Sequence, residues 1–164
     1  MTIRAAIIAF VLATTPAAAA LDGEGIPMND PLLDKMVGHW TLSGTMVGRP
    51  ATHDVDVEWV LNHQFLRIHE VDKAGGYEAM PMIGYDNTSE RYVAHWIDVF
   101  GGRWSETLGY GKRDGDAVVF TFKYPDGPFR TAFRWDGKQW HWTMTQKNAS
   151  GAWTTFAEMV LTKR

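Results

Sequence analysis

Hydrophobic and polar residues alternate with a period of two along most of the chain after Gly38. In residues 53–61, for example, Val55, Val57 and Trp59 alternate with acidic side chains. This spacing is typical of a β-strand with one face against a core and the other against water. The same pattern, interrupted by turn residues, predicts about ten strands: 39–46, 53–61, 64–71, 77–85, 91–100, 103–110, 118–124, 129–135, 138–146 and 153–162.

The connections between the predicted strands are short and contain turn-forming residues. Asp126-Gly127 and Asp136-Gly137 are the strongest hairpin signals, and Gly101-Gly102 breaks another apolar stretch. Short connections join antiparallel neighbours, and a long open meander would leave two unpaired edges. We therefore predict an all-β fold, an up-and-down antiparallel β-barrel of about ten strands.

One short helix is predicted before the first strand. Asp30 is suited to cap a helix, and Pro31 is suited to its first position. Leu32, Leu33 and Met36 then form an apolar stripe, and the glycine that follows ends it. The helix has at most two turns.

Residues 1–20 have the features of a secretory signal peptide. An arginine precedes an apolar run over residues 5–13, and Ala18-Ala19-Ala20 is suited to cleavage. The run is too short to span a bilayer. No later stretch approaches transmembrane length, so no integral membrane segment is expected after removal of the signal peptide. We predict a single mature domain, residues 21–164, in the periplasm or secreted. It contains no cysteine and so depends on its core rather than on disulfides.

Several short motifs of the chain occur together in known proteins. They are Gly38-His39-Trp40, the segment 60–66, Ile83-Gly84-Tyr85-Asp86 and Trp96-Ile97-Asp98. With the ending 158–164, they resemble a bacterial family of secreted, lipocalin-like domains of unknown function, related in architecture to calycin barrels. The resemblance implies a barrel and supplies no catalytic residue. Family members often carry two glycines and an arginine where this chain has Asn62-His63-Gln64.

Aromatic residues make up 13% of the chain and include 8 tryptophans. A barrel wider than eight strands begins to enclose a cavity, so inward aromatic side chains either line a ligand pocket or fill the core. We predict a monomeric protein that binds a small hydrophobic or amphipathic molecule in an aromatic-lined cavity. The candidate ligand-binding residues are Trp40, Trp59, Arg67, His69, Trp96, Phe120, Phe133, Trp140 and Trp142.

The orientation of Arg67 and His69 is open at this point. Both share a strand face with Phe65, and on the inward face they would hold an anionic head group. Leu66 and Ile68 occupy the opposite face, which is equally suited to the interior. The pattern therefore allows both orientations.

Acid–base catalysis is the alternative function. Asp98 and Glu106 lie on two predicted strands joined by a Gly-Gly turn. His95 lies on the same predicted strand as Asp98. An apolar surrounding would raise the pKa of one carboxyl group and allow proton transfer. A buried Asp98 paired with an arginine would instead be structural. No catalytic residue is assigned.

Charge and motif spacing argue against other classes. The formal net charge is −3 without a basic run, which disfavours nucleic-acid binding. None of the 6 histidines has the spacing of a local metal motif, and we predict no metal or cofactor. Some barrels of the resembling calycin type hold haem through one histidine near the chain end. Here residues 153–164 contain no histidine, and His141 alternates out of phase with Trp140 and Trp142, so the resemblance disfavours haem. A filled barrel that acts as an interaction module is a further alternative.

Overall fold

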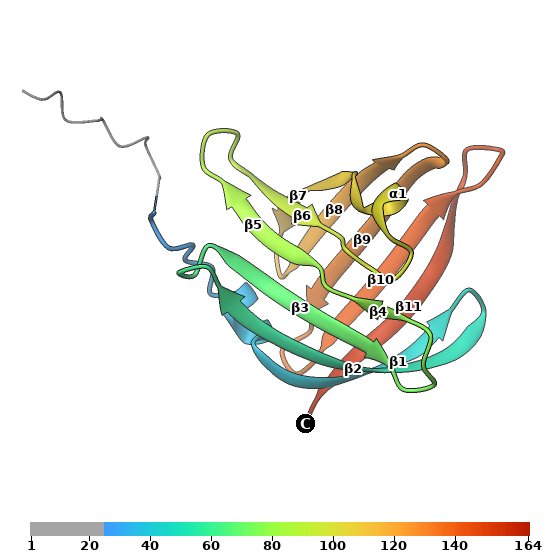
Figure 1. The fold of residues 1–164 in the computed structure, drawn as a ribbon, viewed down its shortest axis with the longest axis horizontal. Coiled ribbons are helices and arrows are strands. Elements are labelled where there is room, and N and C mark those ends of the chain that lie inside the picture. Colours follow the sequence, from blue (N-terminus) through green and yellow to red (C-terminus); the bar gives the residue numbers. More distant parts are fainter. Residues whose placement is uncertain (1–24) are drawn as a thin grey trace, which may run out of the picture.

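The computed structural model describes residues 25–164, so the predicted signal peptide, residues 1–20, lies outside the described residues. Strands dominate the described part of the chain (Figure 1). In chain order the elements are the 3-10 helix η1 (Leu33–Met36), β1 (Gly38–Met46), β2 (Arg49–Val60), β3 (Phe65–Asp72), β4 (Glu78–Ala79), β5 (Met82–Asp86), β6 (Arg91–His95), α1 (Gly102–Ser105), β7 (Leu108–Asp114), β8 (Ala117–Tyr124), β9 (Gly127–Trp135), β10 (Trp140–Lys147) and β11 (Trp153–Lys163).

Within residues 25–164, ten strands close into one antiparallel barrel, as predicted. Consecutive strands are neighbours from β5 to β11, β3 pairs with β5, and β1 pairs with both β2 and β11. Pairing between β2 and β3 completes the ring. The two-residue β4 pairs with β3 beside this ring. Closure gives every barrel strand two partners and removes the unpaired edges of an open sheet.

The inward faces of the strands form one hydrophobic core, and the predicted alternation decides which side chains enter it. Trp40 and Leu42 of β1 are fully buried, as are Trp140 and Trp142 of β10. His141 lies between those two tryptophans on the outer face, as its phase predicted. Burial of one aromatic or large aliphatic side chain contributes about 1.5–3 kcal/mol, so this core is the main source of stability.

Two glycines of β7 make room for aromatic rings. Gly109 and Gly111 occupy inward positions of the strand, opposite Phe122 and Phe120 of β8. A Cβ atom would meet the Phe122 ring at 2.5 Å from Gly109 and the Phe120 ring at 2.6 Å from Gly111. Both rings therefore lie directly over the bare β7 backbone, which only glycine permits.

The two ends of the barrel differ. We call one the strap end, because residues 26–30 (the strap) and η1 lie across it; Leu32, Leu33 and Met36 are buried there in the barrel core. The opposite end, the loop end, carries the connections 47–48, 73–77, 96–107, 125–126 and 148–152.

The boundaries of several elements differ from the prediction. The predicted strand 91–100 ends at His95, so Asp98 lies in the following connection and not in a strand. The predicted strand 103–110 begins only at Leu108, because the preceding residues form the helical turn α1, where Trp104 packs against Tyr124 with ring centroids 5.5 Å apart. The predicted strand 77–85 divides into β4 and β5 around Pro81, which has no N–H for a strand ladder. The predicted helix after Asp30 is a four-residue 3-10 helix.

Candidate functional site

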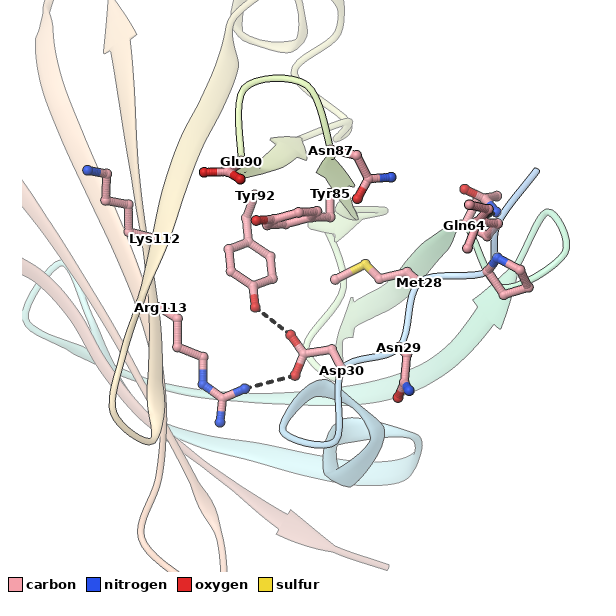
Figure 2. A pocket seen from close by; sticks show the side chains of 12 residues that line it. Met28, Asn29, Asp30, Gln64, Tyr85, Asn87, Glu90, Tyr92, Lys112 and Arg113 are labelled. Atoms are coloured by element: carbon pink, nitrogen blue, oxygen red, sulfur yellow. Dashed lines mark hydrogen bonds and ion pairs between the residues drawn. The ribbon is translucent and has the colours of Figure 1, made fainter. Parts of the chain in front are cut away.

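A pocket of about 480 Å³ lies at the strap end (Figure 2). The strap forms one wall, and the hairpin of β5 and β6 together with the end of β7 forms the others. Its volume falls in the usual range of small-molecule sites, about 300–1,000 Å³. Apolar surface comes from side chains such as Met28 and Tyr85, while Gln64, Glu90 and Arg113 supply polar groups.

The strap is held in place by the turn between β2 and β3. The Met28 amide donates to the His63 carbonyl at 2.9 Å, and Gln64 Nε2 donates to the Ile26 carbonyl at 2.6 Å. Asn62 and His63 both have left-handed backbone conformations, with φ of 55° and 62°. The His63 ring packs on Trp59 with centroids 4.1 Å apart, which fixes this turn against β2.

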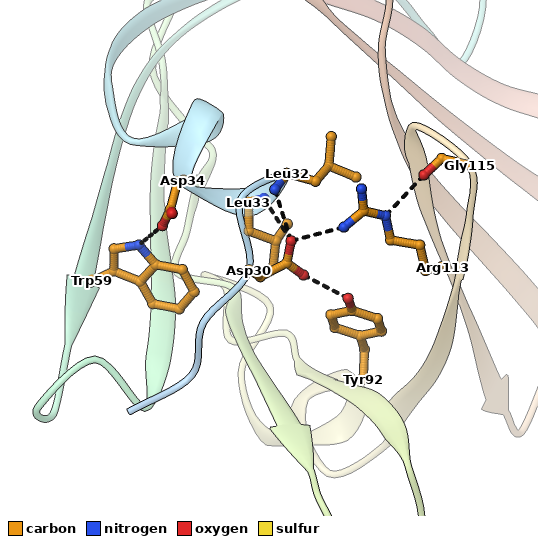
Figure 3. Close-up of polar contacts among 8 residues, drawn as sticks. All are labelled: Asp30, Leu32, Leu33, Asp34, Trp59, Tyr92, Arg113 and Gly115. Carbon is orange, nitrogen blue, oxygen red and sulfur yellow. Dashed lines mark hydrogen bonds and ion pairs between the residues drawn. The ribbon is translucent and has the colours of Figure 1, made fainter. Parts of the chain in front are cut away.

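Asp30 connects the strap, η1 and the barrel wall (Figure 3). Its Oδ1 accepts the amides of Leu32 at 2.9 Å and Leu33 at 3.2 Å, which is the capping role that the Asp-Pro sequence predicts. The same oxygen accepts Arg113 Nη1 at 3.1 Å, and Oδ2 accepts the Tyr92 hydroxyl at 2.6 Å. Asp30 is 4% exposed. Four donors converge on this nearly buried carboxylate, so it positions its neighbours.

Tyr92 and Arg113 form the polar floor of the pocket beside Asp30. Burial, followed by the hydrogen bond to Asp30, raises the pKa of Tyr92 to about 12, so its phenol stays a neutral donor. The Tyr85 ring meets the Tyr92 ring edge-on at 5.1 Å. Arg113 also donates through Nε to the Gly115 carbonyl at 2.9 Å. The site thus combines a tyrosine wall with fixed charges, which suits binding more than proton transfer.

Sequence reasoning recognised Asp30 only as a helix cap and missed Tyr85, Tyr92 and Arg113 as site residues. One signal was present: Arg113 has the same strand parity as Gly109 and Gly111, which directs its side chain to the same face of β7 at the strap end. Its partner Asp30 lies 83 positions away, so no local pattern could identify it.

The predicted aromatic residues pack in or against the barrel core, and none of them lines the strap pocket. Five of them are at most 1% exposed, and Trp59 and Trp96 pack against the same core. Their indole N–H groups have protein partners: Trp40 donates to the Met36 carbonyl at 2.7 Å, and Trp142 donates to Thr131 Oγ1 at 2.7 Å. The five deeply buried residues are Trp40, Phe120, Phe133, Trp140 and Trp142.

Arg67 and His69 lie on the outer face of β3, because Leu66 and Ile68 fill the interior. Arg67 forms an ion pair with Glu58 on the neighbouring strand. His69 Nε2 donates to Glu78 Oε1 at 2.7 Å. The structure therefore does not bring these two side chains to the aromatic interior.

The three residues of the acid–base alternative are not joined by hydrogen bonds. His95 Nε2 donates to the Ser105 carbonyl at 2.6 Å, and Glu106 is exposed after α1. Asp98 accepts the Phe100 amide at 2.9 Å, and burial raises the pKa of its carboxyl group. Within residues 25–164, neither His95 nor Glu106 forms a hydrogen bond or ion pair with Asp98.

Two further observations concern the whole described chain. Residues 25–164 contain no group of three or more His, Asp or Glu side chains placed to hold a metal ion. Over the same residues, no helix has the length and apolar character needed to cross a membrane.

Residues 29–163 match a family described as "Protein of unknown function (DUF1579)". No curated protein matches the chain. The match covers the barrel, η1 and the capping aspartate, and it carries no assigned activity.

Proposed function

Since the chain belongs to the DUF1579 family, whose function is unknown, we propose from its own geometry that it binds a small amphipathic organic molecule in the strap pocket. The observation that carries this proposal is the pocket of about 480 Å³, where Met28 and Tyr85 lie beside the charged groups of Arg113 and Glu90.

The chemistry of the walls supports an amphipathic ligand. The edge-on rings of Tyr85 and Tyr92 offer apolar surface without closing the pocket. Arg113 is 42% exposed and already oriented by two hydrogen bonds, so a polar head group meets a cation whose rotamer entropy is already lost. We also propose that the mature chain acts outside the cytoplasm, because residues 1–20 have the pattern of a secretory signal. We propose that it acts there as a monomer.

Fluorescence titration with 1-anilinonaphthalene-8-sulfonate tests the site, because this probe is aromatic and anionic. We expect saturable binding to one site in the wild-type chain. Tyr85→Ala removes a ring from the pocket wall and should weaken binding about tenfold, the effect of losing one aromatic contact.

Tyr110→Ala is the matched control. Tyr110 is 42% exposed against 39% for Tyr85, and it lies outside the pocket lining. This variant should bind the probe as the wild type does. Equal loss in both variants, or no saturable binding in the wild type, would contradict the proposal.

A further inference from the structure

The loop end of the barrel contains a buried histidine–glutamate pair that the strap pocket does not use. His53 of β2 and Glu70 of β3 occupy inward positions, where the other inward residues of these strands are apolar. His53 is 3% exposed, and Glu70 has no exposed surface. Such a pair costs several kcal/mol to desolvate, so its presence in an apolar barrel needs an explanation.

Only one of the two carboxylate oxygens of Glu70 has a hydrogen-bond partner. His53 Nδ1 donates to Glu70 Oε1, and this bond is the main cause of the raised pKa of His53. Glu70 Oε2 is buried and has no hydrogen-bond partner in the described part of the chain. An unsatisfied buried acceptor of this kind costs about 1–3 kcal/mol, more when it is charged. A bound donor would remove that cost.

Negative charge is in excess around the pair. His53 Nε2 lies 3.9 Å from Asp72 Oδ1, so one histidine ring faces two carboxyl groups, those of Glu70 and Asp72. Asp98 is a third carboxyl group at this end, bridged to β4 through Ala79. Within residues 25–164, no lysine or arginine forms an ion pair with Glu70, Asp72 or Asp98. The site therefore favours a cation over an anion.

Aromatic rings lie next to the His53 side of this pair. The Tyr77 ring lies 5.9 Å from the His53 ring and 5.8 Å from the Phe100 ring, centroid to centroid. Trp96 Nε1 donates to the Tyr77 hydroxyl at 3.2 Å. Aromatic faces next to a carboxylate are the features that recognise an organic ammonium group.

We propose that the loop end of the barrel binds a small organic molecule with a protonated primary amine, which donates an N–H to Glu70 Oε2 while its hydrocarbon part packs on Tyr77 and Trp96. This site is separate from the strap pocket and does not depend on it. Tyr77 and Phe100 belong to the connections 73–77 and 96–107, so the proposed amine approaches Glu70 from the loop end of the barrel.

Isothermal titration calorimetry at about pH 7 tests the proposal with two probes of similar shape. 2-Phenylethylamine carries an ammonium group on a phenylethyl chain, and 3-phenylpropionate carries a carboxylate on the same chain. We expect the amine to bind and the propionate not to bind. Glu70→Gln should weaken amine binding about tenfold or more, because a charge-assisted hydrogen bond is lost. Glu58→Gln, on the outer face of β2, is the matched control and should leave amine affinity unchanged.

Other outcomes would overturn the proposal. They are no amine binding to the wild type, equal binding of the two probes, or equal amine affinity in Glu70→Gln and the wild type. If Glu70→Gln does not fold, nuclear Overhauser contacts between the amine methylene protons and the Trp96 indole of the wild type decide the question, and their absence counts against the site. Tyr85→Ala should bind the amine normally, which separates this site from the strap pocket.

Discussion

The Tyr92 hydroxyl donates a hydrogen bond of 2.6 Å to Asp30 Oδ2 across 62 positions of the sequence. This contact joins β6 to the residue that caps η1, and Arg113 joins the same carboxylate from β7. One buried aspartate therefore closes the strap end of the barrel and shapes the floor of the pocket. Changes at Asp30 should affect stability and ligand binding together.

We expect Asp30→Asn to destabilise the fold by about 2 kcal/mol, the usual cost of losing a hydrogen bond to a buried charge. The amide can still cap η1, but it leaves Arg113 without a carboxylate. Urea unfolding measures the change. Asp116→Asn, on the exposed turn after β7, is the control and should stay within about 0.5 kcal/mol of the wild type. Equal stability of the two variants would show that the Asp30 contacts contribute nothing.

Gly109→Ala should destabilise the barrel by about 1–3 kcal/mol, because its new Cβ lies 2.5 Å from the Phe122 ring and overpacks the core. Thermal unfolding measures the change. A second variant that combines Gly109→Ala with Phe122→Leu should recover part of the loss. Gly102→Ala is the matched control, because open space surrounds that position. If Gly109→Ala unfolds at the same temperature as the wild type, the Phe122 ring moves aside without a cost in stability.

Stability should depend on pH through His53. Its pKa is raised in the folded chain, first by the hydrogen bond to Glu70, so protonated His53 stabilises the folded state. This contribution is complete below the unfolded pKa of about 6.5 and is lost as the pH rises through the folded pKa. The stability difference between the wild type and His53→Gln should therefore shrink toward alkaline pH.

Urea unfolding between about pH 5 and pH 9 checks this dependence. Glu70 and Asp72 are the charged groups that act on His53, and the Tyr77 ring packs near it. His95→Gln controls for the loss of one histidine, since its ring bonds only a backbone carbonyl. A difference between wild type and His53→Gln that stays constant across the range would contradict the assignment.

Local patterns in the sequence were sufficient for most of the fold. A period of two places successive side chains on opposite faces, so it predicted that Trp140 and Trp142 point inward and His141 outward. Short turns predicted antiparallel neighbours, and the number of strands predicted closure. The Asp-Pro start of η1 was also visible, because capping involves residues only two and three positions apart.

Only the tertiary structure decided the orientation of β3 and the location of the pocket. Phe65, Leu66 and Ile68 put apolar side chains on both faces of β3, so hydrophobicity alone could not select the inward face; packing inside the closed barrel selected Leu66 and Ile68. The pocket depends on contacts of Asp30 with residues 62 and 83 positions away. Contacts at such separations arise when the barrel closes, and no periodicity along the chain encodes them.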